Sequence, residues 1–389
     1  MERHLDEDLP SWTTWRGGPW SSQFTVGIEE ELMLLDPRDG SLAFRSDAVV
    51  ADLPAALTGR VSLETHAAVV EVATGVHRRV ADAAIELANR RAQLAGALAA
   101  QGLQAAVAGT HPSAVWSDTV VSSHPRFRDI GESMRVLARR EPTMALHVHV
   151  GIASANAAVR VLNGLRAHLP LLLALSANSP FWQGRDTGFA STRTVLFQAF
   201  PRSGVPRPYR GYRDWAGAIA PLIRSGAIAD PSFIWWDVRL QPRYGTVEVR
   251  IMDGQTAVED VAALAALIQS LARLVLDRPY SAGDEWPAGE VIAENRFLAA
   301  RDGMDARLIE VDAGQRIPAV VQLERLVDAC LPHAEALGCT RELASLRGLA
   351  ADNGAARQLA QNRQSGLRGV TAELARRYSV DAQVSGRAA

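Results

Sequence analysis

This sequence of 389 residues lacks several features of secreted, membrane-bound and zinc-binding proteins. It has only two cysteines, Cys330 and Cys339, and neither lies in a zinc-ligand pattern, so we expect reduced thiols and no structural zinc. No apolar run of about 18 residues occurs, and no basic-then-apolar signal stands at the N-terminus. These absences predict a cytoplasmic protein without a membrane partner.

The sequence also lacks a surplus of either charge. Its 41 basic and 43 acidic side chains give a net charge of −2, so no bulk field attracts nucleic acid or a membrane surface. Neither a GxGxxG pattern nor a P-loop is present. We therefore expect small-molecule substrates, and any nucleotide must be bound by a local cluster of side chains of another kind.

The composition indicates one large domain with loose ends. We expect residues 1–22 to form a flexible arm, residues 23–380 a single domain, and residues 381–389 a frayed end. The tryptophans of the arm (Trp12, Trp15 and Trp20) could dock on the body or on a partner chain, which leaves a homo-oligomer open. The polar segment 178–214 is either a functional loop, such as a lid, or a structural excursion.

Strand patterns come early and in the middle of the chain. Alternating or valine-rich segments predict strands at residues 24–35, 67–74, 103–109, 144–152, 233–240 and 246–253. Helical spacing predicts helices at about 78–101, at 154–177 and over most of 255–378. This order favours an α+β fold, with an antiparallel or mixed sheet covered by helices on one face, over a doubly wound parallel sheet.

The predicted strands carry ionic side chains on one face, because residues two apart in a strand share a face. These pairs are Glu29 and Glu31, His147 and His149, Asp237 and Arg239, and Glu248 and Arg250. Glu71 lies in an apolar run and needs a partner or an ion, and Glu64 could join it. Glu30 points into the apolar face, and the pattern does not explain it.

Each of these strands alone could simply present a solvated face with ordinary surface acids or histidines. Together they predict a sheet face where clustered carboxylates bind divalent cations and arginines bind a triphosphate. Histidine binds manganese or zinc better than magnesium, and it can also donate hydrogen bonds to phosphate or adenine. The combination points to phosphoryl transfer.

Six segments, in this order, resemble the glutamate–cysteine ligase family, and most closely its type 2 branch of bacterial stand-alone carboxylate–amine ligases. They are residues 25–32 (TVGIEEEL), 146–151 (LHVHVG), 175–181 (LSANSPF), 184–188 (GRDTG), 236–239 (WDVR) and 245–250 (GTVEVR). The resemblance runs from about residue 24 to 375. It implies that the single domain is catalytic and has a glutamine-synthetase-like fold, whose antiparallel sheet binds ATP and two or three magnesium ions on its concave face.

The resemblance also implies roles for individual residues. Magnesium ions, or manganese in their place, would be bound by Glu29, Glu31, Glu64, Glu71 and Glu248. His147, His149 and Arg239 would contact the nucleotide, and Arg250, with Glu248, would act on the transferred phosphate. Arg193 and Arg202 are candidate ligands of a substrate carboxylate or of phosphate.

The implied activity is an ATP-dependent carboxylate–amine ligase that acts through an acyl phosphate, with weak activity on glutamate and cysteine. A guanidino-kinase-like phosphotransferase and a non-catalytic ATP-binding regulatory protein are the alternatives. A metallohydrolase using His147 and His149 lacks a further histidine or cysteine at ligand spacing. The sequence leaves the true substrates and the oligomeric state open.

Overall fold

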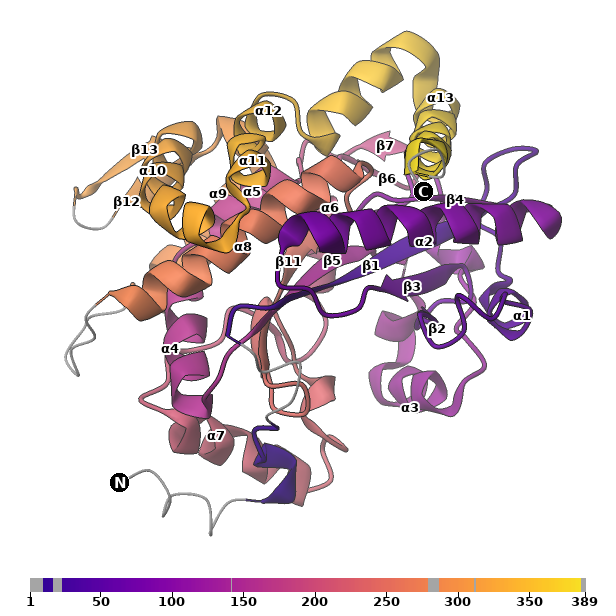
Figure 1. The fold of residues 1–389 in the computed structure, drawn as a ribbon. Coiled ribbons are helices and arrows are strands. Elements are labelled where there is room, and N and C mark those ends of the chain that lie inside the picture. Colours follow the sequence, from indigo (N-terminus) through magenta and orange to yellow (C-terminus); the bar gives the residue numbers. More distant parts are fainter. Residues whose placement is uncertain (1–9, 17–22, 141, 279–286, 311–312, 386–389) are drawn as a thin grey trace.

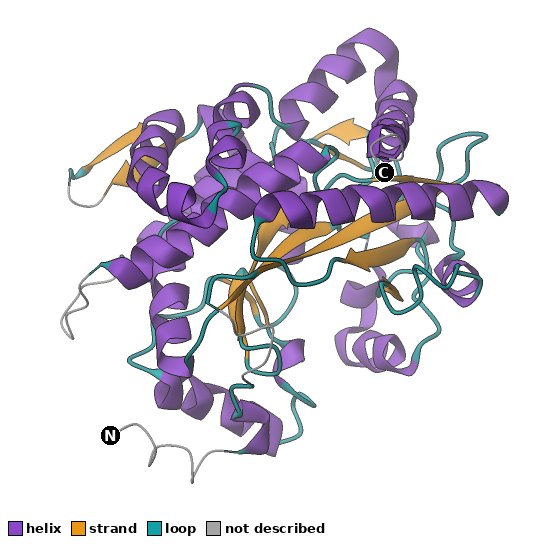
Figure 2. Ribbon diagram, viewed as in Figure 1, coloured by secondary structure: helices purple, strands orange, loops and turns teal. Residues whose placement is uncertain are grey.

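An antiparallel sheet of seven strands forms the centre of the protein (Figures 1 and 2). The computed structural model describes residues 10–16, 23–140, 142–278, 287–310 and 313–385. The strands are β1 (Val26–Leu35), β2 (Val61–Leu63), β3 (Val69–Ala73), β4 (Gln104–Ala106), β5 (Ala145–Gly151), β10 (Val238–Gln241) and β11 (Thr246–Asp253). Their order is β10-β11-β5-β1-β3-β2, and β4 pairs with the end of β1. The predicted α+β class and antiparallel sheet are confirmed.

Helices cover one face of this sheet. The described helices are α1 (Ser46–Ala51), α2 (Val80–Ala100), α3 (Pro125–Met134), α4 (Ala155–Arg166), α5 (Leu169–Ser176), α6 (Thr192–Phe197), α7 (Tyr212–Arg224), α8 (Val258–Asp277), α9 (Gly289–Asp302), α10 (Ala319–Leu337), α11 (Thr340–Ala344), α12 (Leu346–Ala351) and α13 (Gly354–Ser385). The main core lies between the sheet and α2, α4, α5 and α8. Figure 1 shows α2 lying along the sheet, with α13 beside it.

The strand alternation predicted from the sequence explains this core. On β1, Val26, Ile28 and Leu32 are buried against the helices, as are Leu146 and Val148 on β5. Burying these side chains contributes roughly 1.5–3 kcal/mol each, which fixes the apolar face toward the helices. The opposite face carries the ionic side chains, except at the end of β1, where Met33 and Leu35 pack against Val370 and Leu374 of α13.

Glu30 is the exception on the apolar face, and Arg91 of α2 explains it. Both side chains are fully buried, and Arg91 donates two hydrogen bonds to the Glu30 carboxylate, that from Nε at 2.9 Å. Arg91 also donates to the carbonyls of Gln255 and Thr256, and its guanidinium lies 5.3 Å from the ring centre of Tyr378. The pair thus joins the sheet to α2, to the start of α8 and to α13.

Some predicted boundaries were wrong. The helix predicted for residues 154–177 is two helices, α4 and α5, bent by 62°, because Pro170 has no backbone N–H to bond the carbonyl of Arg166 and so cannot continue α4. The segment 178–214 contains α6, the first residues of α7 and the short strands β6 (Phe181–Trp182), β7 (Arg185–Asp186) and β8 (Ser203–Gly204). It is therefore not one long loop.

The C-terminal third also differs in detail from the prediction. Two strands interrupt its helices, β12 (Arg307–Glu310) and β13 (Gln315–Pro318), which pair as a small antiparallel sheet. Helix α13 continues to Ser385 and is broken at Gly366, where φ is 68°. In the described chain no single helix is long and apolar enough to cross a membrane; α4 and α5 meet that criterion only as a bent pair.

Replacing Arg91 with Met should lower the free energy of unfolding by about 3–5 kcal/mol, because Glu30 would remain buried without its partner. Urea unfolding measures the loss. The double variant Glu30→Leu/Arg91→Met should recover most of it, since no unpaired charge then remains. A double variant as unstable as the single one would contradict this explanation.

Candidate active site

Pairing across the sheet aligns ionic side chains on the face opposite the helices. Glu29 of β1 lies opposite His147 of β5, and Glu31 of β1 lies opposite Glu71 of β3. Glu29 Oε2 is 3.5 Å from Nδ1 of His147, and Glu31 Oε1 is 3.7 Å from Nε2 of the same ring. The sequence predicted these side chains on one face of the sheet, and they do meet there although their strands are far apart in the chain.

The same alignment continues toward β10, where Glu248 lies opposite both His149 and Arg239. Glu248 is fully buried, and all four acceptor positions of its carboxylate are used. Arg239 donates to both oxygens (Nε–Oε2 2.7 Å and Nη2–Oε1 3.0 Å), Gln241 donates to Oε2 at 2.7 Å, and Arg250 donates to Oε1. Glu248 thus positions two arginines at the site.

A cleft of about 1160 Å³ lies over this ionic face. The predicted residues that line it are Glu29, Glu31, Glu64, Glu71, His147, His149, Arg193, Arg239 and Arg250. Glu248 lies just beneath the lining. Arg202 is not among the lining residues: its Nε donates to the carbonyl of Phe233, and its guanidinium lies 5.0 Å from the ring centre of Trp235.

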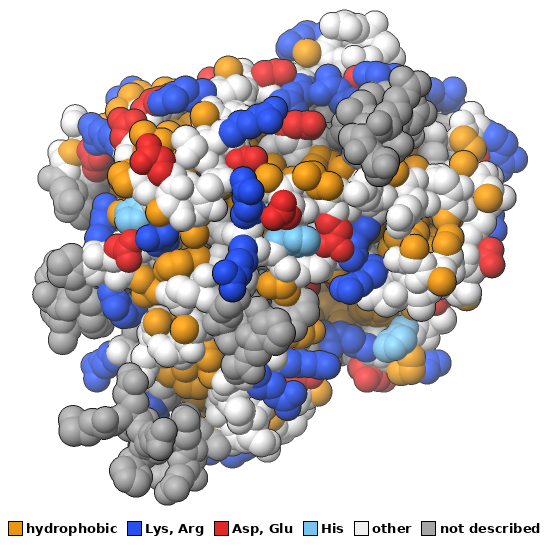
Figure 3. Space-filling view, viewed as in Figure 1, with side chains coloured by type: hydrophobic (Ala, Val, Ile, Leu, Met, Phe, Trp, Pro, Cys, Tyr) orange, Lys and Arg blue, Asp and Glu red, His pale blue; other side chains and the backbone are white. Residues whose placement is uncertain are grey.

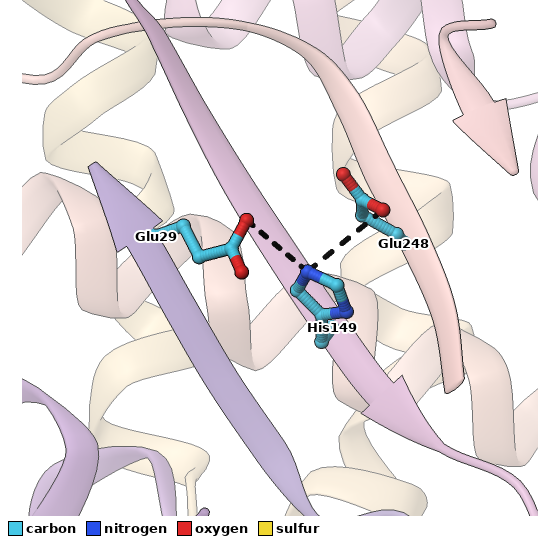
Figure 4. A group of neighbouring side chains, drawn as sticks. All are labelled: Glu29, His149 and Glu248. Carbon is cyan, nitrogen blue, oxygen red and sulfur yellow. Dashed lines mark ion pairs between the residues drawn. The ribbon is translucent and has the colours of Figure 1, made fainter. Parts of the chain in front are cut away.

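The acids and histidines fall into three groups whose ligand atoms lie within 4.8 Å of one another. The groups are Glu29, His149 and Glu248; Glu29, Glu71 and His147; and Glu31, Glu64 and Glu71. Because Glu29 and Glu71 each belong to two groups, the three form one continuous row. Figure 4 shows the first, in which His149 Nε2 is 3.4 Å from Glu29 Oε2 and 3.9 Å from Glu248 Oε2.

This donor set fits magnesium or manganese. The Nε2 atoms of His147 and His149 are buried and have no hydrogen-bond partner among the described residues. In His149, Nδ1 lies 3.0 Å from Thr246 Oγ1, so a proton shared there leaves the Nε2 lone pair facing the carboxylates. Carboxylate oxygens suit both ions, and the imidazoles favour manganese.

Burial and mutual repulsion shift the acids at the β2–β3 end toward their protonated form. Burial, and then the charge of Glu64, raises the pKa of Glu31 to about 8. Burial also raises the pKa of Glu64, and burial followed by the neighbouring carboxylates raises that of Glu71 strongly. For Glu29, burial is outweighed by the charge of His149 and by the close approach of both histidine rings, at 3.4 and 3.5 Å, and its pKa falls. The acid cluster thus needs protons or cations.

A bulge in β11 explains the placing of two further ionic residues. The pairing with β5 shifts between Val249 and Met252, so Asp253, opposite Ala145, lies on the ionic face. Strict alternation from Val249 would have placed it on the apolar face. Asp253 accepts hydrogen bonds from the hydroxyls of Ser179 (2.7 Å) and Ser191 (2.9 Å).

Arg193 of α6 is positioned by this part of β11. It donates to the backbone carbonyls of Arg250 (3.3 Å) and Ile251 (3.1 Å), and its Nη1 lies 3.8 Å from Asp253. Its side chain lines the cleft although it is nearly buried. Arg193 therefore lies at the cleft, and its role there stays a prediction.

The described part of the predicted arm, residues 10–16, packs on the body. The rings of Trp12 and Trp215 meet edge to face with centres 5.8 Å apart, and Trp15 Nε1 donates to the carbonyl of Ile152 at 2.9 Å. Trp12 also lines the end of the cleft. Trp20 lies outside the described residues.

Comparison with known proteins gives the family of this chain. Residues 25–377 match glutamate-cysteine ligase family 2 (GCS2). A Rubrobacter xylanophilus protein provisionally named glutamate–cysteine ligase 2-1 is 38% identical over 327 residues, which cover 83% of this chain and 86% of that protein. A Thermobifida fusca protein, provisionally named glutamate–cysteine ligase 2, is 37% identical over 331 residues, 83% of this chain and 82% of the other.

The chain belongs to glutamate–cysteine ligase family 2. Its fold is also that of the Francisella tularensis glutamate–cysteine ligase in complex with AMP, with a TM-score of 0.67 at 15% identity over 93% of this chain and 90% of that one. A bifunctional glutathione synthetase from Pasteurella multocida also gives a TM-score of 0.67, at 12% identity, over 93% of this chain and 53% of that one.

The resemblance to this family predicted from the six segments is confirmed. The family match begins at residue 25, so Trp12 and the rest of residues 10–16 lie outside it.

Acidic and basic side chains are interspersed over the face seen in Figure 3, in keeping with the near-neutral net charge. The ionic residues of the cleft thus form a local cluster.

Affinity for Mn²⁺ should fall as the pH is lowered from about 8.5 to 6. The pKa of Glu31 is raised to about 8 and that of Glu71 is raised strongly, so protons compete with the cation for these carboxylates. For each proton that must be released, the affinity falls about tenfold per pH unit. Titration calorimetry at several pH values measures this. Glu31→Gln should flatten the dependence, whereas Glu132→Gln, exposed on α3, should not. An affinity of the unaltered protein that does not vary with pH would contradict the prediction.

Proposed function

We propose that this protein is an ATP-dependent carboxylate–amine ligase that acts through an acyl phosphate, with only weak activity on glutamate and cysteine. The observation that carries the proposal is the meeting of clustered carboxylates and buried arginines in a single cleft. Membership of a ligase family supports it, as do the provisional names of the relatives and the AMP complex of the Francisella protein.

In the proposed reaction an oxygen of the substrate carboxylate attacks the γ-phosphorus of ATP. The bond to ADP breaks, and an acyl phosphate forms. The amine nitrogen then attacks the acyl carbon, the bond from that carbon to the phosphate oxygen breaks, and the amine loses a proton. The products are an amide, ADP and inorganic phosphate.

The acids at the base of the cleft would hold the divalent cations. Magnesium there would neutralise charge on the transferring phosphoryl group. The proposed ligands are Glu29, Glu31, Glu64, Glu71, His147, His149 and Glu248. Glu248 would bind a cation with Glu29 and His149 only by exchanging one of its arginine contacts, because its acceptor positions are otherwise filled.

Arginines would orient the phosphates. The sequence contains no lysine, so the 41 basic residues are all arginines, and each can bind phosphate through two donors. Arg250 and Arg239 are held by Glu248, and Arg193 by the end of β11. Buried arginines with fixed partners lose little entropy when phosphate binds, which favours phosphate at this end of the cleft.

Glu29→Gln should lower ATP turnover by at least about 100-fold, because Glu29 belongs to two of the three ligand groups. Glu132→Gln, a change of the same kind on the exposed side of α3, should leave turnover unchanged. ADP production by each purified variant is measured after circular dichroism confirms folding. Turnover of Glu29→Gln near that of the unaltered protein would rule out its role as a metal ligand.

A screen of carboxylates and amines with ATP and magnesium tests the reaction itself. We expect phosphate release only when both substrates are present, and an amide in the mass spectrum. Replacing the amine with hydroxylamine should trap the acyl phosphate as a hydroxamate. A phosphorylated product without phosphate release would indicate the kinase alternative, and magnesium-dependent ATP binding without turnover would indicate a regulatory protein.

A further inference from the structure

An apolar wall borders the cleft on the side of α3. The wall consists of Leu63, Phe127, Ile130, Met134, Phe200 and Trp235, the last from the short strand β9 (Trp235–Trp236). These residues belong to a hydrophobic cluster that is separate from the main core. Leu63, Phe200 and Trp235 are only half-buried. Apolar surface left open in an ionic cleft suits a ligand with an apolar body.

The wall meets the cleft beside the acid cluster, and at its other end Arg239 donates to the carbonyl of Ile234, next to Trp235. Leu63 directly precedes Glu64, and Ser62 pairs with Glu71 across β2 and β3. A triphosphate is attracted to the arginines, and in-line transfer places the acceptor on the far side of the γ-phosphorus. Beside the acid cluster, the wall therefore suits the two substrates that react there, the carboxylate that receives the phosphoryl group and the amine that attacks its acyl carbon.

Arg126 is a cation at this side of the cleft. Its half-buried side chain extends from α3 and lines the cleft, and it makes no ion pair with a described residue. Its Nη2 donates to the Ser232 hydroxyl at 3.0 Å, and its guanidinium lies 4.5 Å from the ring centre of Phe233. Arg239 donates to the Ser232 carbonyl, so Ser232 separates the two arginines. The remaining donors of Arg126 can bind a carboxylate in a bidentate way.

On the basis of the proposed ligase function, we propose that the amine substrate is an amino acid with an apolar side chain. Its side chain packs against the apolar wall, and its carboxylate pairs with Arg126. Its amino group then lies nearest the acid cluster, where the acyl phosphate forms. The carboxylate substrate lies between this amino acid and the nucleotide, so each partner in the reaction has its own section of the cleft.

Equilibrium binding tests this proposal without requiring turnover. Calorimetry on the full chain with magnesium and a non-hydrolysable ATP analogue should show L-phenylalanine binding at least about tenfold more tightly than L-serine. Arg126→Gln should weaken L-phenylalanine binding about tenfold and leave phenethylamine, which has no carboxylate, unchanged. Phe200→Ala should weaken L-phenylalanine but not L-serine. Arg128→Gln, exposed on the same helix and outside the cleft lining, should change neither.

Equal or tighter binding of L-serine would overturn the proposal, as would absence of binding by both amino acids. A loss of affinity for the ATP analogue in Arg126→Gln, with L-phenylalanine unaffected, would assign this side of the cleft to the nucleotide and overturn it too. Failure of the ligase proposal appears separately, as no amide product in the phosphate-release screen. Thermal unfolding of each variant confirms that the folded protein is being compared.

Discussion

Repulsion between carboxylates that the backbone holds close together is the constraint on which this structure depends. Glu31 and Glu71 are fixed by the pairing of β1 with β3, so they cannot separate as acids on loops can. The helices on the other face are joined to β1 by the Glu30–Arg91 pair, so the strands cannot move apart to separate the two carboxylates. Relief must come from protons or from cations, and at neutral pH a divalent cation relieves it best. The proposed cation binding would therefore be a property of the sheet itself.

The opposite end of the ionic face has the reverse arrangement. There Glu248 is outnumbered by Arg239 and Arg250, so charge is already compensated and a positive excess remains. The face thus runs from an acid-rich end to an arginine-rich end across strands of one rigid sheet. A triphosphate and its cations match that gradient, because the phosphates can contact arginines while the cations contact acids. In the proposed function, charge alone would then orient the nucleotide.

Much of this site was predictable because strand periodicity is local. Counting by two placed Glu29, His147 and Glu248 on one face, and a family resemblance supplied their neighbours. Glu30 looked anomalous because its partner, Arg91, lies 61 residues away on a helix. The break before α5 was readable at Pro170. The position of Arg126 was not, since nothing local in its segment indicates which side of a cleft a helix will form. Contacts that depend on tertiary packing leave no such periodic signal.

The β11 bulge has a consequence for any change in the length of this strand. One extra residue lets β11 present Glu248 before the irregularity, Arg250 within it and Asp253 after it, all toward the same side. If the same residues paired with β5 without the bulge, Asp253 would move one register position along and lie among hydrocarbon side chains, away from Ser179 and Ser191. Arg193 would lose its support at the same time. Deletion of one residue within the bulge would therefore leave Asp253 opposite Ala145, whereas a deletion at a regularly paired position of β11 would turn the residues beyond it to the other face.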